Sequence, residues 1–595
     1  MSNTKNTAAK KRYSFLAITL ALLLLVTILF WGVSSDWGKV TIKRVYTFAH
    51  DGDKISMIVY IPDTATDENP APVVLNFHGR ANSTHTLDAE SLEQARRGYI
   101  VVNVDRSGCG ESLFTSGDDE AAYQYAMSLS CADKNNFMAT GFSAGCSNAA
   151  KLANAHDNFS ACIQIFPPYF NEGAGKTPTN HLLCKAEGDQ YNWEIVGDLA
   201  ACEALIPANL GLDVDAIEEG KIYGSFEDRT AKQYVLCNDS LHQTAGVSSP
   251  AITTMLDFMQ AAHPGGTQIP GSDHVYWSAQ WLALAGCILM MIFAMALGST
   301  LLDHPYFAEL KQPMTSNNRG KRGTKDILWH LCIAIGIPLV TFIPVSTFGM
   351  DWLSKNAIFP AKNFNGIWVW LIFNVMITLC IMFYNHKKDG KKGEKLVLSD
   401  YLLCSEGETK VNVTRVFKGF VLAVIVTTVF YMSLRVMDSY FGVSFQFMTL
   451  AALTEVSPER LRKAIPYICV LFIVLFVNGI GMNTSRRVKD SGNPTRDMVK
   501  ACLINAAVAA SAVAILLIAH HGTCFFNHGC GIWHFTPGHS SVGSLNFAFA
   551  FPFLMGSMGA INTYYYRKTG TVWTGAFVTA MIAGITAFVA QPLVM

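Results

Sequence analysis

The sequence predicts two structural units: a largely parallel α/β domain followed by a bundle of transmembrane helices. The chain has 595 residues, well above the usual size of one domain. Before about residue 275, short β-rich runs alternate with helical patterns, an order typical of a parallel sheet. After that point, long apolar runs alternate with short polar or basic stretches. We therefore expect an N-terminal segment 1–36, an α/β domain 37–270 and a membrane domain 271–595.

The first apolar run, residues 14–31, follows four basic residues and is long enough to span about 30 Å of hydrocarbon. A cleaved signal peptide usually has a shorter apolar region and a small-residue exit site, which the stretch 31–35 lacks. We therefore interpret residues 1–36 as a cytoplasmic basic tail and an uncleaved anchor. The basic flank places the N-terminus inside and the α/β domain outside the cytoplasm.

Eight further apolar runs predict a membrane bundle, so that about nine transmembrane helices are expected in total. Three connections between the runs are basic and lie on the cytoplasmic side in this count: 302–326, 386–415 and 483–498. The protein is thus expected in the plasma membrane of a prokaryote, with the lipid bilayer as a partner. The runs are 277–301, 327–348, 366–384, 417–436, 464–482, 499–519, 542–562 and 572–592.

One basic cluster opposes this topology. Arg460, Arg462 and Lys463 fall outside in the nine-helix count, beside an apolar stretch at 441–453 that is too short to cross comfortably. We interpret that stretch as interfacial or re-entrant. If it crossed, every later segment would invert, and the basic connection 483–498 would lie outside.

The α/β domain begins with a predicted hairpin. Two β-rich runs meet at Asp51-Gly52-Asp53, a tight-turn signal for an antiparallel pair at the edge of a sheet. The later run 73–77 is apolar almost throughout, as a strand covered on both faces should be. The predicted strands are 41–49, 54–62, 72–78, 99–105, 136–142, 161–166, 181–187 and 233–237.

A G-x-S-x-G motif, residues 141–145, lies between the fifth predicted strand and a helical stretch from Cys146 to about Ala155. A nucleophile elbow has this context: the serine occupies a strained turn, and glycines on either side, here Gly141 and Gly145, relieve crowding. Ser143 is therefore the candidate nucleophile. A glycine-rich turn before a helix is also a common structural device.

Two features upstream strengthen the prediction of a catalytic site. His78-Gly79-Arg80 follows an apolar strand, so the backbone N–H of Arg80 could face a developing oxyanion together with that of Ala144. Alternatively, His78 simply caps the strand. Farther along, Gly98-Tyr99 leads through an apolar strand into a glycine-rich segment at 105–112.

The order H-G, then G-Y-x-V-V-x-V-D-x-x-G-x-G-x-S, then G-F-S-A-G resembles the α/β-hydrolase superfamily. The opening D-G-D-K-I-S-M-I-V-Y-I-P resembles its serine peptidase and esterase branches. The resemblance covers about residues 40–263. It implies a catalytic triad in the chain order Ser, Asp or Glu, His, so the acid and the base should follow Ser143.

The resemblance places the base at His242, after the last predicted strand, although a surface loop histidine is the alternative. For the acid it favours Asp189, directly after the strand 181–187. The rivals are Glu187, Glu227 and Asp228, because an insertion at about 190–232 separates Asp189 from the last strand. Such an insertion usually forms a cap over the site.

The expected function is that of a serine hydrolase of the esterase, lipase or peptidase type, which forms an acyl-enzyme on the serine. Its substrate would be a small acyl ester, a lipid or a peptide, and the chemistry requires no cofactor and no metal. Lys and Arg together number 45, as do Asp and Glu, so charge favours no nucleic-acid partner. The alternatives are an acyltransferase using the same serine, and a transporter or channel with a non-catalytic outer domain. The oligomeric state is left open.

Cysteines and intramembrane polar residues offer weaker signals. The outer domain holds seven cysteines, among which Cys184 and Cys237 lie on strands that are often neighbours in this fold. In the loop after the seventh span, Cys524 and Cys530 lie among five histidines; we favour a disulfide between them over a zinc site. Five polar residues within the spans could form a polar path or interhelical hydrogen bonds: His330, Asn374, Asn478, Asn505 and Asn546.

Overall fold

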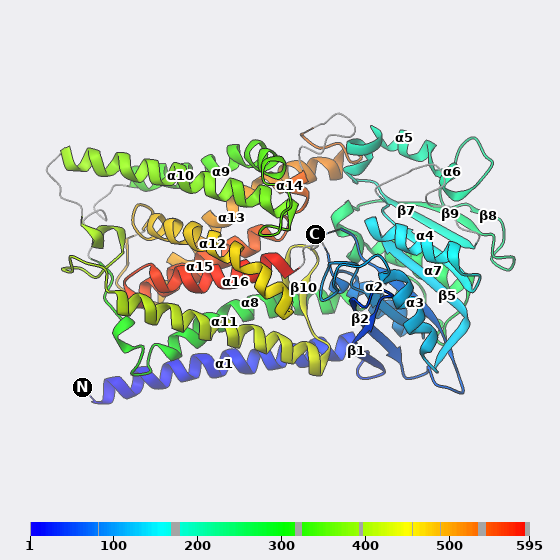
Figure 1. Ribbon diagram of the computed structural model, residues 1–595, viewed down its shortest axis with the longest axis horizontal. Coiled ribbons are helices and arrows are strands. Elements are labelled where there is room, and N and C mark those ends of the chain that lie inside the picture. The colour runs from blue at the N-terminus through cyan, green and yellow to red at the C-terminus, as the bar shows by residue number, and fades with distance from the viewer. Residues whose placement is uncertain are drawn as a thin grey trace.

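The computed structural model describes residues 2–80, 82–167, 179–315, 324–391, 397–454, 456–487, 489–533 and 543–589. In these residues, a helical bundle and a sheet domain lie end to end along the long axis of the molecule (Figure 1). Helix α1 (Ser2–Ser34) begins at the far end of the bundle and leads directly into the sheet domain.

The sheet domain is built on a nine-stranded sheet in the order β1-β2-β4-β3-β5-β6-β7-β9-β8. Neighbours from β4 to β9 pair in parallel, whereas β1, β2 and β8 add antiparallel edges. All eight predicted strands are present, and among the described residues of this sheet only the two-residue strand β8 was not predicted. The strands are β1 (Val40–Phe48), β2 (Lys54–Pro62), β3 (Ala71–Phe77), β4 (Ile100–Val104), β5 (Ala132–Phe142), β6 (Phe159–Ile165), β7 (Asn180–Ala186), β8 (Ile222–Tyr223) and β9 (Lys232–Cys237).

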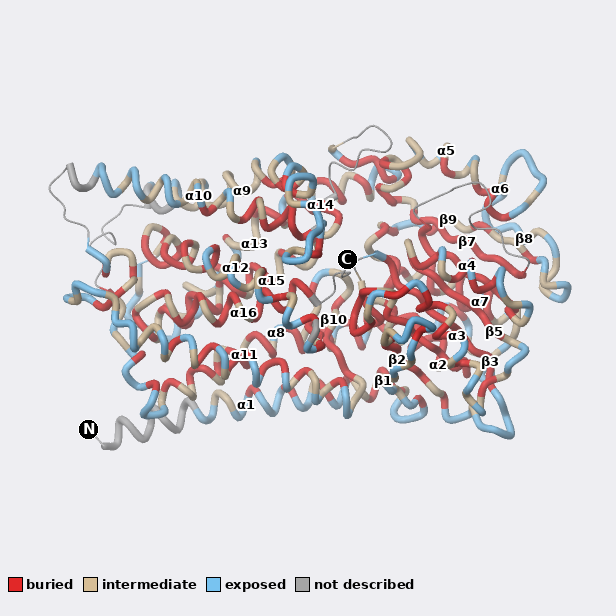
Figure 2. Tube along the Cα trace, in the orientation of Figure 1, coloured by how far each residue is buried: buried red, intermediate tan, exposed pale blue. Residues whose placement is uncertain are grey.

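Two apolar clusters cover the two faces of the sheet. Helices α2 (Asp88–Arg96) and α7 (Ser249–Ala262) pack on one face, and α3 (Asp118–Ser128) and α4 (Cys146–Ala155) pack on the other. Every residue of β3, β4, β6 and β7 is consequently buried, as Figure 2 shows for the interior of this domain. This double burial explains why the central strands are apolar almost throughout.

The strand register brings the carboxyl ends of the central strands to one edge. Phe77 of β3 pairs with Val104 of β4 and with Gly141 of β5, and Ala186 of β7 pairs with Cys237 of β9. The loops that follow these strands carry most of the predicted site residues. They therefore meet at a single edge of the sheet, where parallel α/β folds place their ligands.

Seven helices of the described chain are long and apolar enough to cross a membrane: α1 and α8 to α13. Helices α15 and α16 complete the bundle, although α15 is less apolar and α16 is only 17 residues long. The bounds are α8 (Tyr276–Leu301), α9 (Thr324–Trp352), α10 (Lys362–Lys391), α11 (Val413–Phe441), α12 (Pro458–Asn483), α13 (Pro494–Phe526), α15 (Phe551–Thr569) and α16 (Trp573–Val589).

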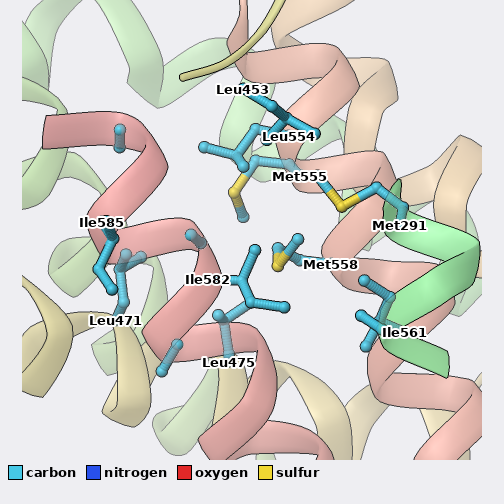
Figure 3. Close-up of a cluster of buried hydrophobic side chains, with 14 of the residues drawn as sticks. Met291, Leu453, Leu471, Leu475, Leu554, Met555, Met558, Ile561, Ile582 and Ile585 are labelled. Carbon is cyan, nitrogen blue, oxygen red and sulfur yellow. The ribbon is translucent and has the colours of Figure 1, made fainter. Parts of the chain in front are cut away.

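Helices α15 and α16 lie in the centre of the bundle. Met558 and Ile561 of α15 and Ile582 of α16 pack against Leu475 of α12 and Met291 of α8 (Figure 3). Because other helices enclose α15, it can carry polar residues that a lipid-facing helix would avoid. The predicted span 542–562 is wrong in its bounds: residues 543–546 form the separate short helix α14, and α15 starts at Phe551 with a proline in its first turn.

The outer surface of the bundle is apolar. Large side chains such as Trp329, Val340 and Ile518 are 65%, 70% and 73% exposed. Helices α9 and α10 present much of this surface (Figure 2). An extended apolar exterior is compatible with a membrane protein, because lipid tails cover such a surface without cost.

The basic connections gather at the end of the bundle away from the sheet domain (Figure 1). Lys418 lies 2.8 Å from Glu309, and Arg567 lies 2.8 Å from Asp490, so ion pairs tie these connections to neighbouring helices. Arg487 adds a 3.0 Å hydrogen bond to the carbonyl of Thr315. The connections that were predicted to share one side therefore do share one end of the bundle.

The opposite end of the bundle binds the sheet domain through buried polar contacts. Arg44 of β1 forms a 3.0 Å ion pair with Asp438 of α11, and Arg460 of α12 donates to the carbonyl of Gly108. Arg460 is only 2% exposed, so its charge is used inside the interface rather than in a loop. The stretch 441–453 does not cross the bundle but forms a hairpin of β10 (Phe445–Phe447) and β11 (Ala451–Leu453).

Candidate active site

Ser143 occupies a tight turn between β5 and α4, with a backbone φ of 51°. The flanking glycines are required by close approaches: a Cβ on Gly141 would lie 2.5 Å from the nitrogen of Cys146, and one on Gly145 would lie 2.0 Å from the oxygen of Phe77. The turn thus presents the serine side chain at the carboxyl edge of the sheet, as a nucleophile elbow requires.

Ser143, His242 and Asp189 form a continuous hydrogen-bonded chain. Nε2 of His242 lies 2.8 Å from Oγ of Ser143, and its Nδ1 lies 2.9 Å from Oδ2 of Asp189. All three are buried, at 7%, 5% and 0% exposure for the serine, the histidine and the aspartate. With the ring proton on Nδ1, the imidazole donates to the carboxylate and accepts from the serine hydroxyl.

The carboxylate of Asp189 has more partners than sequence reasoning foresaw. Nζ of Lys185 lies 3.1 Å from Oδ2, and the backbone N–H of Tyr191 donates to Oδ1 at 2.9 Å. Burial raises the pKa of Asp189, but its electrostatic interactions with His242 and Lys185 and these hydrogen bonds outweigh it and lower the pKa to about 2. The group is therefore an anion at neutral pH despite complete burial.

The rival acids lie elsewhere. Glu187 is on the same loop, but its carboxylate pairs with Nδ1 of His528 at 2.9 Å. Glu227 and Asp228 are exposed in the turn before β9. Of the four candidates, the structure brings only Asp189 into contact with His242.

The segment after β3 lies against the serine. A Cβ on Gly79 would meet Cβ of Ser143 at 3.1 Å, and Arg80 lines the same cavity as Ser143. Ala144 follows the serine in the short turn Ser143–Gly145, directly before α4. Both predicted backbone donors thus belong to segments that adjoin the nucleophile.

His78 connects this segment to the loop that follows β4. Its Nδ1 lies 2.8 Å from the carbonyl of Gly79, and its Nε2 accepts from the backbone N–H of Arg106 at 3.0 Å. Burial and the nearby positive charge of Arg106 lower the pKa of His78 to about 3, so the ring is neutral. It links the two loops that follow β3 and β4 rather than merely capping a strand.

The glycine-rich segment 105–112 is also a scaffold. The buried carboxylate of Asp105 accepts from the backbone N–H groups of Thr84 and Glu111, at 2.9 and 3.0 Å. Gly110 has a φ of 50°, and a Cβ there would lie 2.0 Å from that carboxylate. The motif therefore shapes the loop beside the site.

A cavity of about 150 Å³ opens beside Ser143 and His242, between the sheet domain and the bundle. Of the predicted cap at 190–232, only Tyr191 lines it; helices α5 (Leu199–Ala204) and α6 (Ile206–Leu210) follow farther along that segment. The bundle contributes an apolar lining that sequence reasoning missed: Phe364, Met448, Phe547, Phe549, Ala550, Phe551, Phe553, Leu554 and Ala587.

The cysteines form no disulfide in the structure. Cys184 and Cys237 do lie on the neighbouring strands β7 and β9. The predicted bridge between Cys524 and Cys530 is wrong: Cys524 is a free thiol, and its Sγ lies near Gly531 instead.

The polar residues within the bundle separate into three settings. His330, Asn374 and Asn478 line a second cavity, of about 170 Å³, together with Arg486. Asn505 donates to Thr563 across two helices at 2.8 Å, and Asn546 lines the cavity beside Ser143. They do not form one continuous path.

No family model and no curated protein matches the chain. Among solved structures, similar chains include DcsB in complex with its substrate analogue, at 13% identity over 37% of this chain and 98% of that chain, with a TM-score of 0.28. An esterase from Pyrococcus furiosus matches at 13% identity over 38% and 91%, with a TM-score of 0.28. Oligopeptidase B from Leishmania major matches at 13% identity over 38% of each chain, also with a TM-score of 0.28.

Proposed function

We propose that this protein is a membrane-anchored serine hydrolase of the α/β-hydrolase superfamily, which cleaves acyl ester or amide bonds outside the cytoplasm. The observation that carries the proposal is the hydrogen-bonded chain Ser143–His242–Asp189 at the mouth of a cavity. A nucleophile, a base and an orienting acid in this geometry are the parts that acyl transfer requires.

In the proposed reaction, Oγ of Ser143 attacks the acyl carbon while Nε2 of His242 takes its proton, and Asp189 stabilises the resulting imidazolium. The backbone N–H groups of Arg80 and Ala144 hold the tetrahedral oxyanion. Collapse breaks the bond to the leaving group, which receives the proton from His242. Water then attacks the acyl-enzyme with His242 again as base, and the acid is released.

The lining of the cavity supports an apolar acyl group as the part of the substrate that is bound. Phe364, Phe551 and Leu554 come from the bundle, and a cavity of about 150 Å³ accommodates a group of about six carbons, the size of benzene. Each buried methylene contributes roughly 0.8 kcal/mol. An acyl ester or lipid that reaches the site from the bilayer fits this lining better than a polar peptide.

The arrangement of the helices supports nine crossings with the N-terminus in the cytoplasm. The basic connections share the end away from the sheet domain, as the positive-inside rule requires of cytoplasmic loops. Arg460 opposed this topology as a loop charge, but it is bound inside the interface. We therefore propose that the hydrolase site lies on the outer side of the membrane, and that the membrane is the plasma membrane of a prokaryote.

Acyl transfer is the second candidate, because the acyl-enzyme is common to both reactions. Ser143 is only 7% exposed, and side chains of the bundle line its cavity. Such a site restricts the access of water and gives a membrane-borne alcohol or amine a route to the acyl-enzyme. Release of free acid from a purified ester substrate, without added acceptor, favours hydrolysis.

The test is labelling with a fluorophosphonate probe in membranes that contain the full chain. We expect the unchanged protein to label and both Ser143→Ala and His242→Ala to lose labelling, while Ser128→Ala, which alters an exposed serine, labels normally. The proposal fails if the folded unchanged protein does not label, or if Ser143→Ala labels equally well.

A further inference from the structure

Three side chains capable of binding a metal converge at the C-terminal end of α13, which lies toward the sheet domain. One ligand atom each from His520, His521 and Cys524 lies within 4.8 Å of the other two. The three residues are 1%, 2% and 0% exposed, so this is an interior cluster and not a solvated surface. We propose that His520, His521 and Cys524 bind a zinc ion.

His521 is the observation that points most directly to a ligand. Both of its ring nitrogens are buried and have no hydrogen-bond partner among the described residues. Its ring packs against Phe549 at 4.6 Å and against His520 at 4.9 Å. A buried imidazole without a partner is costly, because buried polar groups are nearly always satisfied. A metal ion bound to one ring nitrogen gives that nitrogen a partner and so lowers the free-energy cost of burying the imidazole.

The geometry suits zinc with little rearrangement. Because the three ligand atoms lie within 4.8 Å of one another, a point exists that is at most about 2.8 Å from all three, which is 4.8 Å divided by the square root of three. Zinc binds imidazole nitrogen at about 2.0 Å and thiolate sulfur at about 2.3 Å. The ligand atoms therefore need to close in by at most about 0.8 Å for nitrogen and about 0.5 Å for sulfur.

The residue types select the metal. Two imidazoles and a thiolate suit borderline-soft zinc, whereas calcium and magnesium require oxygen ligands. Binding would deprotonate the thiol of Cys524, with release of its proton to water. The turn at Gly531 packs against the cluster, because a Cβ there would lie 3.0 Å from Sγ of Cys524. Cys530, the preceding residue, or a water molecule can complete a tetrahedron there.

The turn after the cluster supports the loop of the proposed catalytic acid. Nδ1 of His528 pairs with Glu187 at 2.9 Å, and Nε1 of Trp193 donates to the carbonyl of His528 at 3.1 Å. Gly529 packs so tightly that a Cβ would lie 2.3 Å from the carbonyl of Asp189. Zinc would therefore fix the end of α13, and through it the position of Asp189. This last consequence rests on the proposed function, but metal binding itself does not.

The experiment measures metal in the full chain, purified in detergent after growth with zinc and then separated by gel filtration. We expect about one zinc per chain in the unchanged protein and in Ser143→Ala. His521→Ala and Cys524→Ser should each lose at least 80% of it, whereas Cys469→Ser, an exposed thiol on α12, should keep it. A metal-free unchanged protein, or full zinc in Cys524→Ser, would overturn the proposal.

Cobalt substitution of the unchanged protein guards against variants that fail to fold. Cobalt(II) bound by Cys524 should give a thiolate-to-cobalt absorption band in the near ultraviolet, and its absence in cobalt-loaded protein contradicts the site. Chelation should also slow fluorophosphonate labelling by about tenfold or more, because misplacement of a positioning group is costly. Zinc retained in a protein that does not label would refute the hydrolase function and leave the metal site standing.

Discussion

Lys185 and Asp189 form a fully buried ion pair, with the lysine Nζ 3.1 Å from carboxylate oxygen Oδ2. The same oxygen lies 2.9 Å from Nδ1 of His242. Lys185 also donates to the carbonyl of Pro167 at 2.9 Å. The lysine thus compensates the charge that the proposed catalytic acid would otherwise carry alone in the interior.

Replacement of Lys185 by methionine should destabilise the protein by about 3 kcal/mol, because it leaves one charge of a buried pair uncompensated. The measurement is thermal unfolding in detergent, compared with Lys151→Met, which removes an ammonium that is itself exposed and pairs with Asp119. Equal stability of the Lys185 and Lys151 variants would show that the buried pair is not needed.

Asp189→Asn should lower kcat, measured per folded protein, by about 10⁴-fold, because the asparagine cannot stabilise the imidazolium or hold its tautomer. Glu187→Gln, which removes the pairing with His528, should lower kcat far less. The comparison uses hydrolysis of a soluble acyl ester. A larger loss in Glu187→Gln than in Asp189→Asn would assign the acid to Glu187.

Because of the buried Glu90 of α2, we expect the stability of the folded protein to depend on pH. Burial raises the pKa of Glu90 to about 8, and its Oε1 has no hydrogen-bond partner within the part of the chain that the structure describes. The pKa of Glu90 is higher in the folded than in the unfolded protein. The stability that protonated Glu90 contributes is therefore fully present below about pH 4.5, and roughly 4 kcal/mol of it is lost as the pH rises to 8. Glu90→Gln should therefore show a smaller fall in unfolding temperature between pH 5 and pH 8.5 than the unchanged protein. If the variant and the unchanged protein show the same pH dependence, Glu90 is ionised in the folded state.

Ala550→Phe should fill the part of the cavity that the bundle provides. We expect kcat/KM for a hexanoyl ester to fall at least tenfold, because each methylene excluded from an apolar pocket loses about 1–3 kcal/mol of binding free energy. The kcat/KM for an acetyl ester should change less than twofold. Val340→Phe, on the exposed surface of α9, is the control. Equal losses for both esters would mean that the acyl group binds elsewhere.

The elements that sequence alone predicts well are those with local causes. The turn at Ser143 needs glycines at 141 and 145 because the strand and the helix approach each other there. That requirement is visible in five consecutive residues, 141–145. The resemblance to the α/β-hydrolase superfamily then indicated Asp189 and His242, which follow predicted strands.

The features that cannot be predicted from sequence alone depend on contacts between distant segments. Lys185 appears in the sequence as one strand residue among others, and only the fold places it beside Asp189. Phe551 and Leu554 line the cavity of Ser143 from about 400 residues away, so no local pattern reveals them. Arg460 opposes the predicted topology as a loop charge, and only the fold shows that it donates to the carbonyl of Gly108.

Identification of the residue that carries the acyl group is the most direct test of the proposed chemistry. The unchanged protein is incubated with a slowly hydrolysed acyl ester, quenched in acid, digested and analysed by mass spectrometry. We predict that the acyl mass is found on the peptide that contains Ser143. In His242→Ala it should accumulate only at elevated pH, where hydroxide takes the serine proton in place of the imidazole. An acyl group on another residue, or none on a folded and incubated chain, would contradict a serine hydrolase.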